Sequence, residues 1–116
     1  MGYYEGNIYY GVGGISGSTF TNSKVNKCVN NGNVTASLYA GGLVGATGKS
    51  NITTYEYIVD GENTGTITAN SYAGGIISVS FAEIKSCQNK GEVVVTESIV
   101  GGVVAENNAQ VTNCTN

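Results

Sequence analysis

The stretch Tyr39-Ala40-Gly41-Gly42-Leu43-Val44-Gly45 decides the fold, because the chain returns to close variants of it three more times. The variants are Gly11-Val12-Gly13-Gly14-Ile15-Ser16-Gly17, Tyr72-Ala73-Gly74-Gly75-Ile76-Ile77-Ser78 and Ile99-Val100-Gly101-Gly102-Val103-Val104-Ala105. The second glycines of the four pairs are 28, 33 and 27 residues apart. Intervals of roughly 20 to 50 residues are typical of repeat proteins.

Three further positions recur at fixed distances after each glycine pair. An aliphatic position is occupied by Val25, Ile58, Ile84 and Val111. Three residues later a box begins whose third residue is always Asn: Cys28-Val29-Asn30-Asn31-Gly32, Gly61-Glu62-Asn63-Thr64-Gly65, Cys87-Gln88-Asn89-Lys90-Gly91 and Cys114-Thr115-Asn116. Two residues beyond the last glycine of the box stands another aliphatic residue: Val34, Ile67 or Val93. Each repeat therefore holds three short apolar segments separated by Gly and Asn.

Val, Ile, Thr and Tyr favour strands, whereas Gly and Asn suit sharp corners. No apolar pattern of helical period persists. A propeller blade needs four strands and about 40 residues, which these repeats lack. We therefore expect an all-β fold, a parallel right-handed β-solenoid of about four coils with three short strands each. The chain is predicted to be one solenoid segment with repeats at 11–37, 38–70, 71–97 and 98–116 and a partial preceding coil at 1–10.

Stacked coils place equivalent residues about 4.8 Å apart, so each recurring position becomes a column. We expect Asn30, Asn63, Asn89 and Asn116 to form an amide ladder. Cys28, Cys87 and Cys114 share another column, with Gly61 in the second coil, and are expected to be small buried thiols. Cys87 and Cys114 would be one coil apart, within the Cα range of a disulfide, so their redox state stays open.

The composition argues against several classes of function. Charged residues make up 11% of the chain, there is no His, and the net charge is −3 with only five Lys and no Arg. Nucleic-acid binding needs clustered basic residues, and no apolar run approaches the length of a membrane span. A zinc site needs four ligands. Gly48-Lys49-Ser50 suggests a phosphate loop, but Leu43 stands where that motif needs Gly. We expect no catalytic residue, no cofactor and no metal.

One insertion is the candidate for ligand contact. Gly42 is 19 residues from the box at Gly61, against 12 to 14 in the other repeats, and the excess falls within 48–57. Insertions in solenoids emerge on one face and often contact ligands. Lys49, Asn51, Tyr55 and Tyr57 are the predicted contact residues, for a host glycan or protein. The Tyr39/Tyr72 column is open to two interpretations, an exposed aromatic ladder for glycans or packing on the flank of the coil.

Gly42-Leu43-Val44-Gly45 reads Gly-Leu-x-Gly, and the repeat resembles the GLUG motif that occurs in tandem in bacterial surface proteins. Gly14-Ile15-Ser16-Gly17 keeps both end glycines, while the two later copies lose the last one. The resemblance implies a β-solenoid on an adhesin-like protein without catalysis by the repeats. It also implies an extracellular or cell-surface location in a bacterium, with a leader that has been trimmed.

The ends of the chain are in register with each other. The sequence stops inside a box at Cys114-Thr115-Asn116, and Met1-Gly2 would complete that box, which places Gly102 and Gly14 28 residues apart in the cyclic sense. This indicates either a fragment of a longer array or chains that stack head to tail. We therefore expect a structural or adhesive repeat module whose partners are neighbouring repeats. The alternative is a subunit that stacks with identical chains into an extracellular fibre.

Overall fold

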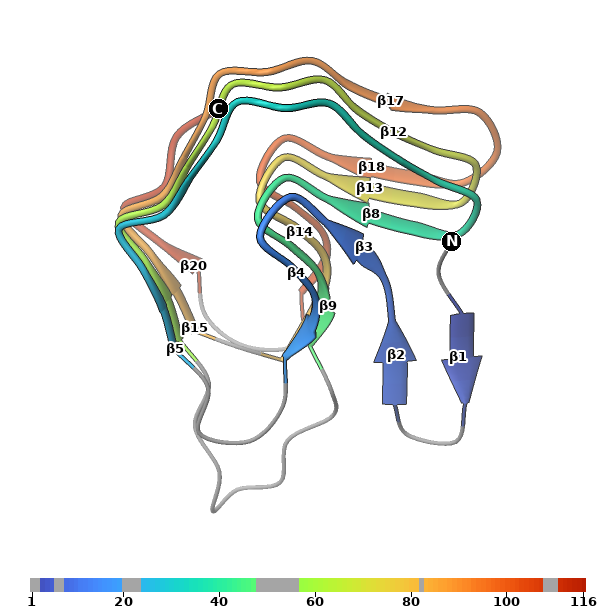
Figure 1. Ribbon diagram of the computed structural model, residues 1–116, viewed down its shortest axis with the longest axis horizontal. Coiled ribbons are helices and arrows are strands. Elements are labelled where there is room, and N and C mark those ends of the chain that lie inside the picture. Colours follow the sequence, from blue (N-terminus) through green and yellow to red (C-terminus); the bar gives the residue numbers. More distant parts are fainter. Residues whose placement is uncertain (1–2, 6–7, 20–23, 48–56, 82, 108–110) are drawn as a thin grey trace.

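The computed structural model describes residues 3–5, 8–19, 24–47, 57–81, 83–107 and 111–116 (Figure 1). Within these ranges the chain forms short strands and no helix, so no helix there is long and apolar enough to cross a membrane. All strands from the third onward pair in parallel. The parallel β-solenoid predicted from the repeat is confirmed.

The strands divide into successive coils. The first coil holds β3 (Val12–Gly13), β4 (Ser16–Thr19), β5 (Lys24–Asn26), β6 (Val29–Asn30) and β7 (Val34–Ala36). The second coil holds β8 (Tyr39–Gly41), β9 (Val44–Thr47), β10 (Tyr57–Val59), β11 (Glu62–Asn63) and β12 (Ile67–Ala69). The third coil holds β13 (Tyr72–Gly74), β14 (Ile77–Ser80), β15 (Glu83–Lys85), β16 (Gln88–Asn89) and β17 (Val93–Val95). The last coil holds β18 (Ile99–Gly101), β19 (Val104–Asn107) and β20 (Val111–Thr112), with Thr115 bridging to Gln88.

Equivalent strands stack into five parallel sheets, ordered β18-β13-β8-β3, β19-β14-β9-β4, β20-β15-β10-β5, β16-β11-β6 and β17-β12-β7. The register of these sheets follows the repeat: Ile67 pairs with Val34 in the coil before and with Val93 in the coil after. A full coil has five strands, however, and not the three that we expected. The box forms a strand of its own, and the glycine pair bends the chain so that the residues before and after it pair in separate sheets.

The N-terminal segment also departs from the expectation of a partial preceding coil at 1–10. Its described residues form β1 (Tyr3–Glu5) and β2 (Ile8–Tyr10), which pair antiparallel with each other. Figure 1 shows this hairpin beside the coil, next to β4 and β9, and not over the end of the coil. A strand at 3–5 finds its partner within the same short segment, so it does not join the β7 column.

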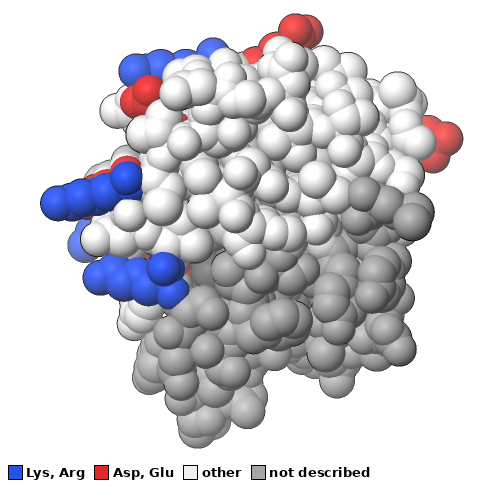
Figure 2. All heavy atoms as spheres, viewed as in Figure 1, with Lys and Arg blue, Asp and Glu red and all other residues white. Residues whose placement is uncertain are grey.

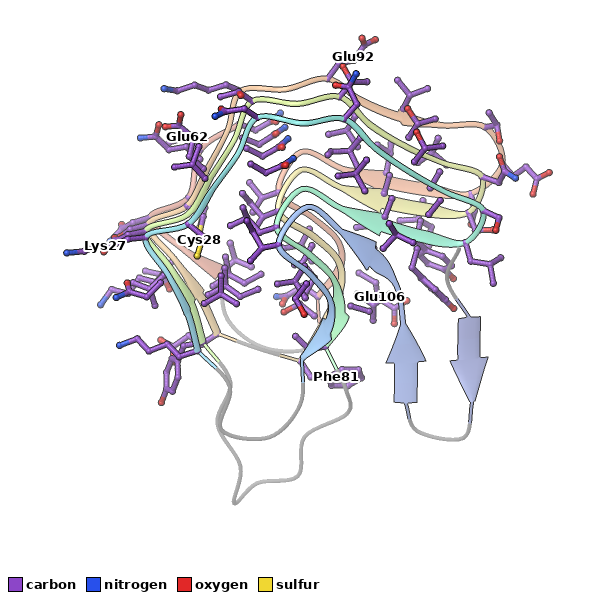
Figure 3. The ribbon with its side chains drawn as sticks, in the orientation of Figure 1. Lys27, Cys28, Glu62, Phe81, Glu92 and Glu106 are labelled. Carbon is purple, nitrogen blue, oxygen red and sulfur yellow. The ribbon has the colours of Figure 1, made fainter. Side chains whose placement is uncertain are left out.

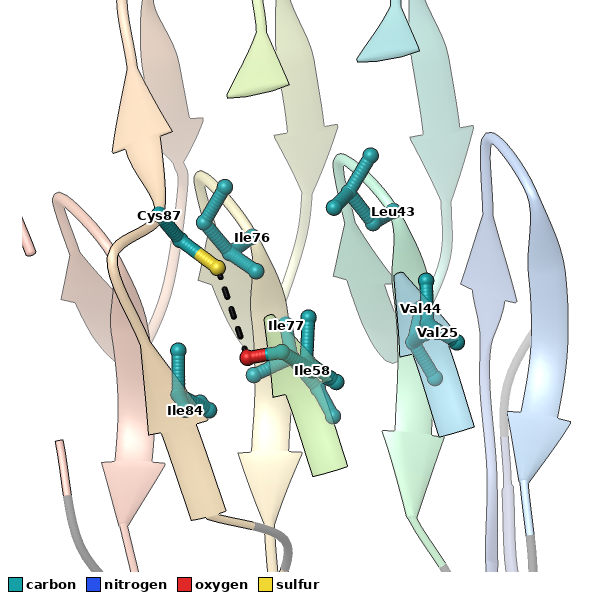
Figure 4. Packing of buried hydrophobic residues seen from close by; sticks show 8 residues of the cluster. All are labelled: Val25, Leu43, Val44, Ile58, Ile76, Ile77, Ile84 and Cys87. Carbon is teal, nitrogen blue, oxygen red and sulfur yellow. Dashed lines mark hydrogen bonds between the residues drawn. The ribbon is translucent and has the colours of Figure 1, made fainter. Parts of the chain in front are cut away.

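Each coil is bent at the glycine pair (Figure 1). The sheets of β7 and β8 face each other across a core of alanine, valine and isoleucine: Val34, Ala36, Ala40, Ile67, Ala69 and Ala73. The sheets of β5 and β9 face each other across a bulkier core: Val25, Leu43, Val44, Ile58, Ile76, Ile77, Ile84 and Cys87 (Figure 4). Because each fully buried aliphatic side chain contributes roughly 1.5–3 kcal/mol, these two cores hold the bent coil together.

Candidate functional site

The asparagine column lies at the bend of the coil. Asn30 Nδ2 donates to Asn63 Oδ1 at 2.8 Å, Asn63 Nδ2 donates to Asn89 Oδ1 at 2.8 Å, and Asn89 Nδ2 donates to Asn116 Oδ1 at 2.9 Å. Each of the first three amides also exchanges a pair of hydrogen bonds with the backbone of the glycine two residues later. The buried amides are therefore engaged in holding neighbouring coils in register.

The glycine pairs are explained by this ladder. A Cβ on Gly42 would lie 2.6 Å from Asn63 Cγ, and a Cβ on Gly75 would lie 2.2 Å from Asn89 Cγ. Only glycine therefore leaves room for the asparagine side chain at the inside of the bend. The two most regular features of the sequence, the glycine pair and the Asn of the box, are the two sides of one packing contact.

The cysteine column lies just before the bend, and its three thiols are free. Cys87 is fully buried, while Cys28 and Cys114 are half-buried. The Cys87 thiol donates to the carbonyl oxygen of Ile58 at 3.5 Å (Figure 4) and to that of Lys85 at the same distance. Burial raises the pKa of the Cys87 thiol from 9.0 to about 11, because desolvation disfavours the thiolate. Among the described residues no group of three or more His, Cys, Asp or Glu is placed to hold a metal ion.

Gly61 takes the cysteine position in the second coil, and Leu43 occupies the space that a side chain there would need. A Cβ on Gly61 would lie 2.3 Å from Leu43 Cδ1. The neighbouring coils have Cys at this position and the shorter-reaching β-branched residues Ile15 and Ile76 in the Leu43 column. The larger Leu43 thus fills in the second coil the space that a Cys side chain fills in the neighbouring coils.

The residue before each box has a left-handed backbone, which the sequence analysis missed. Lys27, Asp60 and Ser86 have φ of 55°, and Asn113 has φ of 52°. This conformation makes the corner into the box, so that Lys27 points outward and Cys28 points inward (Figure 3). Asn and Asp tolerate this region, so Asp60 and Asn113 were the available signal, but Lys27 and Ser86 conceal it.

Of the predicted contact residues, Lys49, Asn51 and Tyr55 lie outside the described residues. Tyr57 is described as the first residue of β10, and its side chain is half-buried. It stands in register between Lys24 of the first coil and Glu83 of the third. A cation, a phenol and a carboxylate thus share one column at the corner where the 48–56 segment joins the coil, and together they offer both donors and acceptors to a polar ligand.

The Tyr39 and Tyr72 rings stack with their centroids 5.1 Å apart and an interplanar angle of 26°. They pack with Ala46, Val79 and Phe81 in a cluster separate from the two cores. Tyr39 is buried and Tyr72 is half-buried. Of the two interpretations given above, this arrangement favours packing on the flank of the coil, at least for the buried Tyr39 ring.

Charged side chains are sparse, and the described lysines gather along one side of the coil (Figure 2). They are Lys24, Lys27, Lys85 and Lys90. In the described part of the chain one salt bridge forms, between Lys90 Nζ and Glu62 Oε2 at 3.2 Å. Both side chains are substantially exposed, so this pair contributes little to stability.

The geometry thus gives a bent parallel solenoid, an internal amide ladder and a polar column beside the insertion. We compared the chain with protein-family models, with curated proteins and with solved structures. None of the three comparisons gave a match.

Proposed function

We propose that the chain is a non-enzymatic structural and adhesive repeat module of a bacterial cell-surface or secreted protein. The observation that carries this proposal is that the recurring buried polar groups form hydrogen bonds within the solenoid itself. The amides of the Asn column bond to one another and to the backbone of their own boxes. The Cys87 thiol bonds to main-chain carbonyl oxygens. These recurring groups serve the stacking of coils, as expected of a spacer built from repeats.

The surface compartment is supported by the resemblance to the GLUG repeat, and the buried Cys87 thiol is consistent with it. Gly42-Leu43-Val44-Gly45 provides the resemblance. Thiolates are the species that oxidise, so a buried thiol with a raised pKa resists oxidation. Cys87 combines full burial with a pKa of about 11. This thiol is suited to persist in an oxidising environment without a disulfide.

The adhesive part of the proposal rests on the insertion within 48–57. It is the one change of length in a coil whose only other departure from the columns is Gly61 in place of Cys, and such insertions in solenoids often contact ligands. The described residue at its end, Tyr57, lies between Lys24 and Glu83. A phenol flanked by a cation and a carboxylate suits hydrogen bonding to the hydroxyl groups of a glycan, or to a polar protein surface.

The experiment is a binding screen of the chain on arrays of host glycans and extracellular host proteins. A variant lacking residues 48–52 has the connection length of the first coil and is the test of the insertion. The control variant is Tyr72→Phe, which removes one hydroxyl from a ring in a different sheet, that of β8 and β13. We expect a ligand that binds the parent chain and the control, and binds the shortened variant at least about tenfold more weakly.

Two results would change the proposal. If neither the parent chain nor the shortened variant binds any ligand, the adhesive part is wrong and a spacer remains. If the parent chain releases products from any arrayed glycan, the non-enzymatic part is wrong.

A further inference from the structure

Two of the three thiols lie in adjacent coils and have the same orientation. Cys87 Sγ lies 3.5 Å from Ile58 O in the coil before it (Figure 4). Cys114 Sγ lies 3.9 Å from the equivalent oxygen one coil later, Ile84 O. Each thiol also donates to the carbonyl oxygen two residues earlier in its own coil, at 3.5 Å for Cys87 and 3.3 Å for Cys114. The two side chains are therefore related by one coil, and their sulfur atoms are separated by the strand spacing of about 4.8 Å.

This separation suits a metal ion between the sulfur atoms and does not suit a disulfide. A disulfide needs sulfur atoms about 2.05 Å apart and Cβ atoms about 3.5–4.5 Å apart. The shift by one coil keeps the Cβ atoms, like the sulfur atoms, about 4.8 Å apart. A cation centred between the two sulfur atoms would lie roughly 2.4 Å from each, close to the 2.3 Å or so of a zinc–thiolate bond. The stacking of the coils thus fixes two thiols at the distance of a metal bridge.

The ligands available at this pair indicate which metal it would take. Among the described residues no third His, Cys, Asp or Glu joins Cys87 and Cys114, so the pair does not suit zinc, which takes four ligands. Thiolates are soft ligands that select copper(I), and copper(I) accepts a linear site with two ligands. Both cysteines pack in the core that contains Ile58, Ile76 and Ile84. An apolar shell of this kind limits the access of solvent to a metal.

Backbone groups are placed to support the two sulfur atoms as ligands. Cys87 N donates to Cys114 Sγ at 3.5 Å. Burial raises the pKa of the Cys87 thiol to about 11, and a hydrogen bond from the Gly61 backbone acts in the opposite direction. Each sulfur therefore has a backbone donor in the coil before it. Hydrogen bonds of this outer kind orient the ligands of a metal and tune its affinity.

We propose that Cys87 and Cys114 bind one copper(I) ion between the third and the last coil, in a linear site with two thiolate ligands. Each sulfur forms one bond to the metal and releases one proton, so two neutral thiols and one monovalent cation give a complex of charge −1 and two protons. The inference goes beyond the proposed function and does not rest on it.

The third cysteine of the column does not belong to this site. Cys28 is two coils from Cys87, a distance of about 9.6 Å, and Gly61 occupies the position between them. A single metal ion cannot bridge sulfur atoms that far apart. Cys28 is therefore a thiol of the same column, with the same contact to the carbonyl oxygen two residues earlier, but without a second thiol in the next coil.

Anaerobic titration of the full chain with copper(I), in competition with a chromogenic copper(I) chelator, tests the proposal. Cys114→Ser removes one ligand at a half-buried position. Cys28→Ser is the matched control, because it removes a thiol that is also half-buried and belongs to the same column. Circular dichroism confirms that both variants are folded.

We expect the parent chain and Cys28→Ser to bind one copper(I) ion per chain, and Cys114→Ser to bind it at least about 100-fold more weakly. X-ray absorption of the loaded parent chain should show two sulfur neighbours for each copper. The metal should also raise the midpoint of thermal unfolding of the parent chain and of Cys28→Ser by at least about 5 °C, because it binds the folded chain. Cys114→Ser should show no such rise.

Three results would overturn the proposal. The first is a parent chain that binds no copper(I). The second is equal binding by Cys28→Ser and Cys114→Ser, which indicates capture by any free thiol or bridging between chains. The third is a copper with three or more sulfur or nitrogen neighbours. All three results leave the repeat-module function intact, whereas the glycan screen tests that function without reference to the metal.

Discussion

The second coil and the last coil carry the same kinds of residue in the same columns, yet their environments differ. Ile58 is fully buried while its equivalent Val111 is 40% exposed, and Ala40 is fully buried while its equivalent Val100 is 54% exposed. Asn63 bonds to an asparagine on each side, whereas Asn116 bonds to one. The comparison teaches that each repeat specifies its own side chains, but the coils on either side determine how much those side chains stabilise the fold.

The largest expected effect is on the glycine that ends the box. A Cβ on Gly65 of the second coil would lie 2.0 Å from Gly32 O, so Gly65→Ala must force two coils apart. We expect it to lower the free energy of unfolding by about 3–5 kcal/mol. Gly32 of the first coil has only Asn30 Oδ1 near, at 3.7 Å, so Gly32→Ala should change stability by about 0.5 kcal/mol or less. Urea unfolding monitored by circular dichroism measures both, and equal losses would contradict the comparison.

The next effect is on the amide ladder. Asn63→Ala removes a side chain with four hydrogen bonds, so that Asn30 Nδ2 and Asn89 Oδ1 each lose their partner in the next coil and the Gly65 backbone loses both bonds to the amide. We expect a loss of about 2–4 kcal/mol. Asn116→Ala breaks one bond at an exposed end, and about 0.5–1 kcal/mol is expected. The same unfolding measurement applies, and a ladder that tolerates the central substitution as well as the terminal one would show that the bonds contribute little.

The buried thiol gives stability a dependence on pH. The pKa of Cys87 is raised to about 11 in the folded chain from 9.0, so the unfolded chain loses this proton first as the pH rises. Its contribution is complete below pH 9 and is lost as the pH rises toward about 11, amounting to roughly 2–3 kcal/mol. Unfolding free energies from pH 7 to pH 11 should therefore fall more steeply for the parent chain than for Cys87→Ala, which shows the background from Tyr and Lys. Parallel profiles would contradict this role of the thiol.

The smallest effect is expected at the left-handed corner. Ser86 has φ of 55° in the third coil, and Asn113 has φ of 52° at the equivalent place in the last coil. Ser86→Gly should raise the free energy of unfolding by about 0.5–1 kcal/mol by removing the conformational penalty. Asn113→Gly should change it by less than about 0.5 kcal/mol, because Asn already tolerates this conformation. Thermal and urea unfolding of both variants would show whether the serine corner is strained.

Much of the stacking was predictable from the spacing of residues. Val34, Ile67 and Val93 lie in one parallel sheet, as their equal distances from the box indicated. The bend and the number of strands were not predictable, because the role of a glycine pair depends on the Asn side chain that packs against it from elsewhere in the coil. The hairpin at β1 and β2 was missed for a related reason, since a strand near the end of the chain can pair locally instead of joining the column.

Only part of the candidate ligand site could be predicted from the sequence. The extra length between Gly42 and Gly61 located the insertion, but spacing alone did not indicate that Tyr57 stands between Lys24 and Glu83. Those three residues are far apart along the chain and meet only because their strands stack. The packing of the Tyr39 and Tyr72 rings against Ala46, Val79 and Phe81 was likewise not predictable, because these residues come from different strands of the coil.

The sequence by itself determined which residues share a column and that the columns are parallel, because a repeat of constant composition can bury its apolar side chains only against copies of itself. Only the tertiary structure decided the bend, the direction of the amide ladder and the burial of each coil. These depend on contacts between segments that the repeat does not order relative to one another, and on whether a further coil lies above or below.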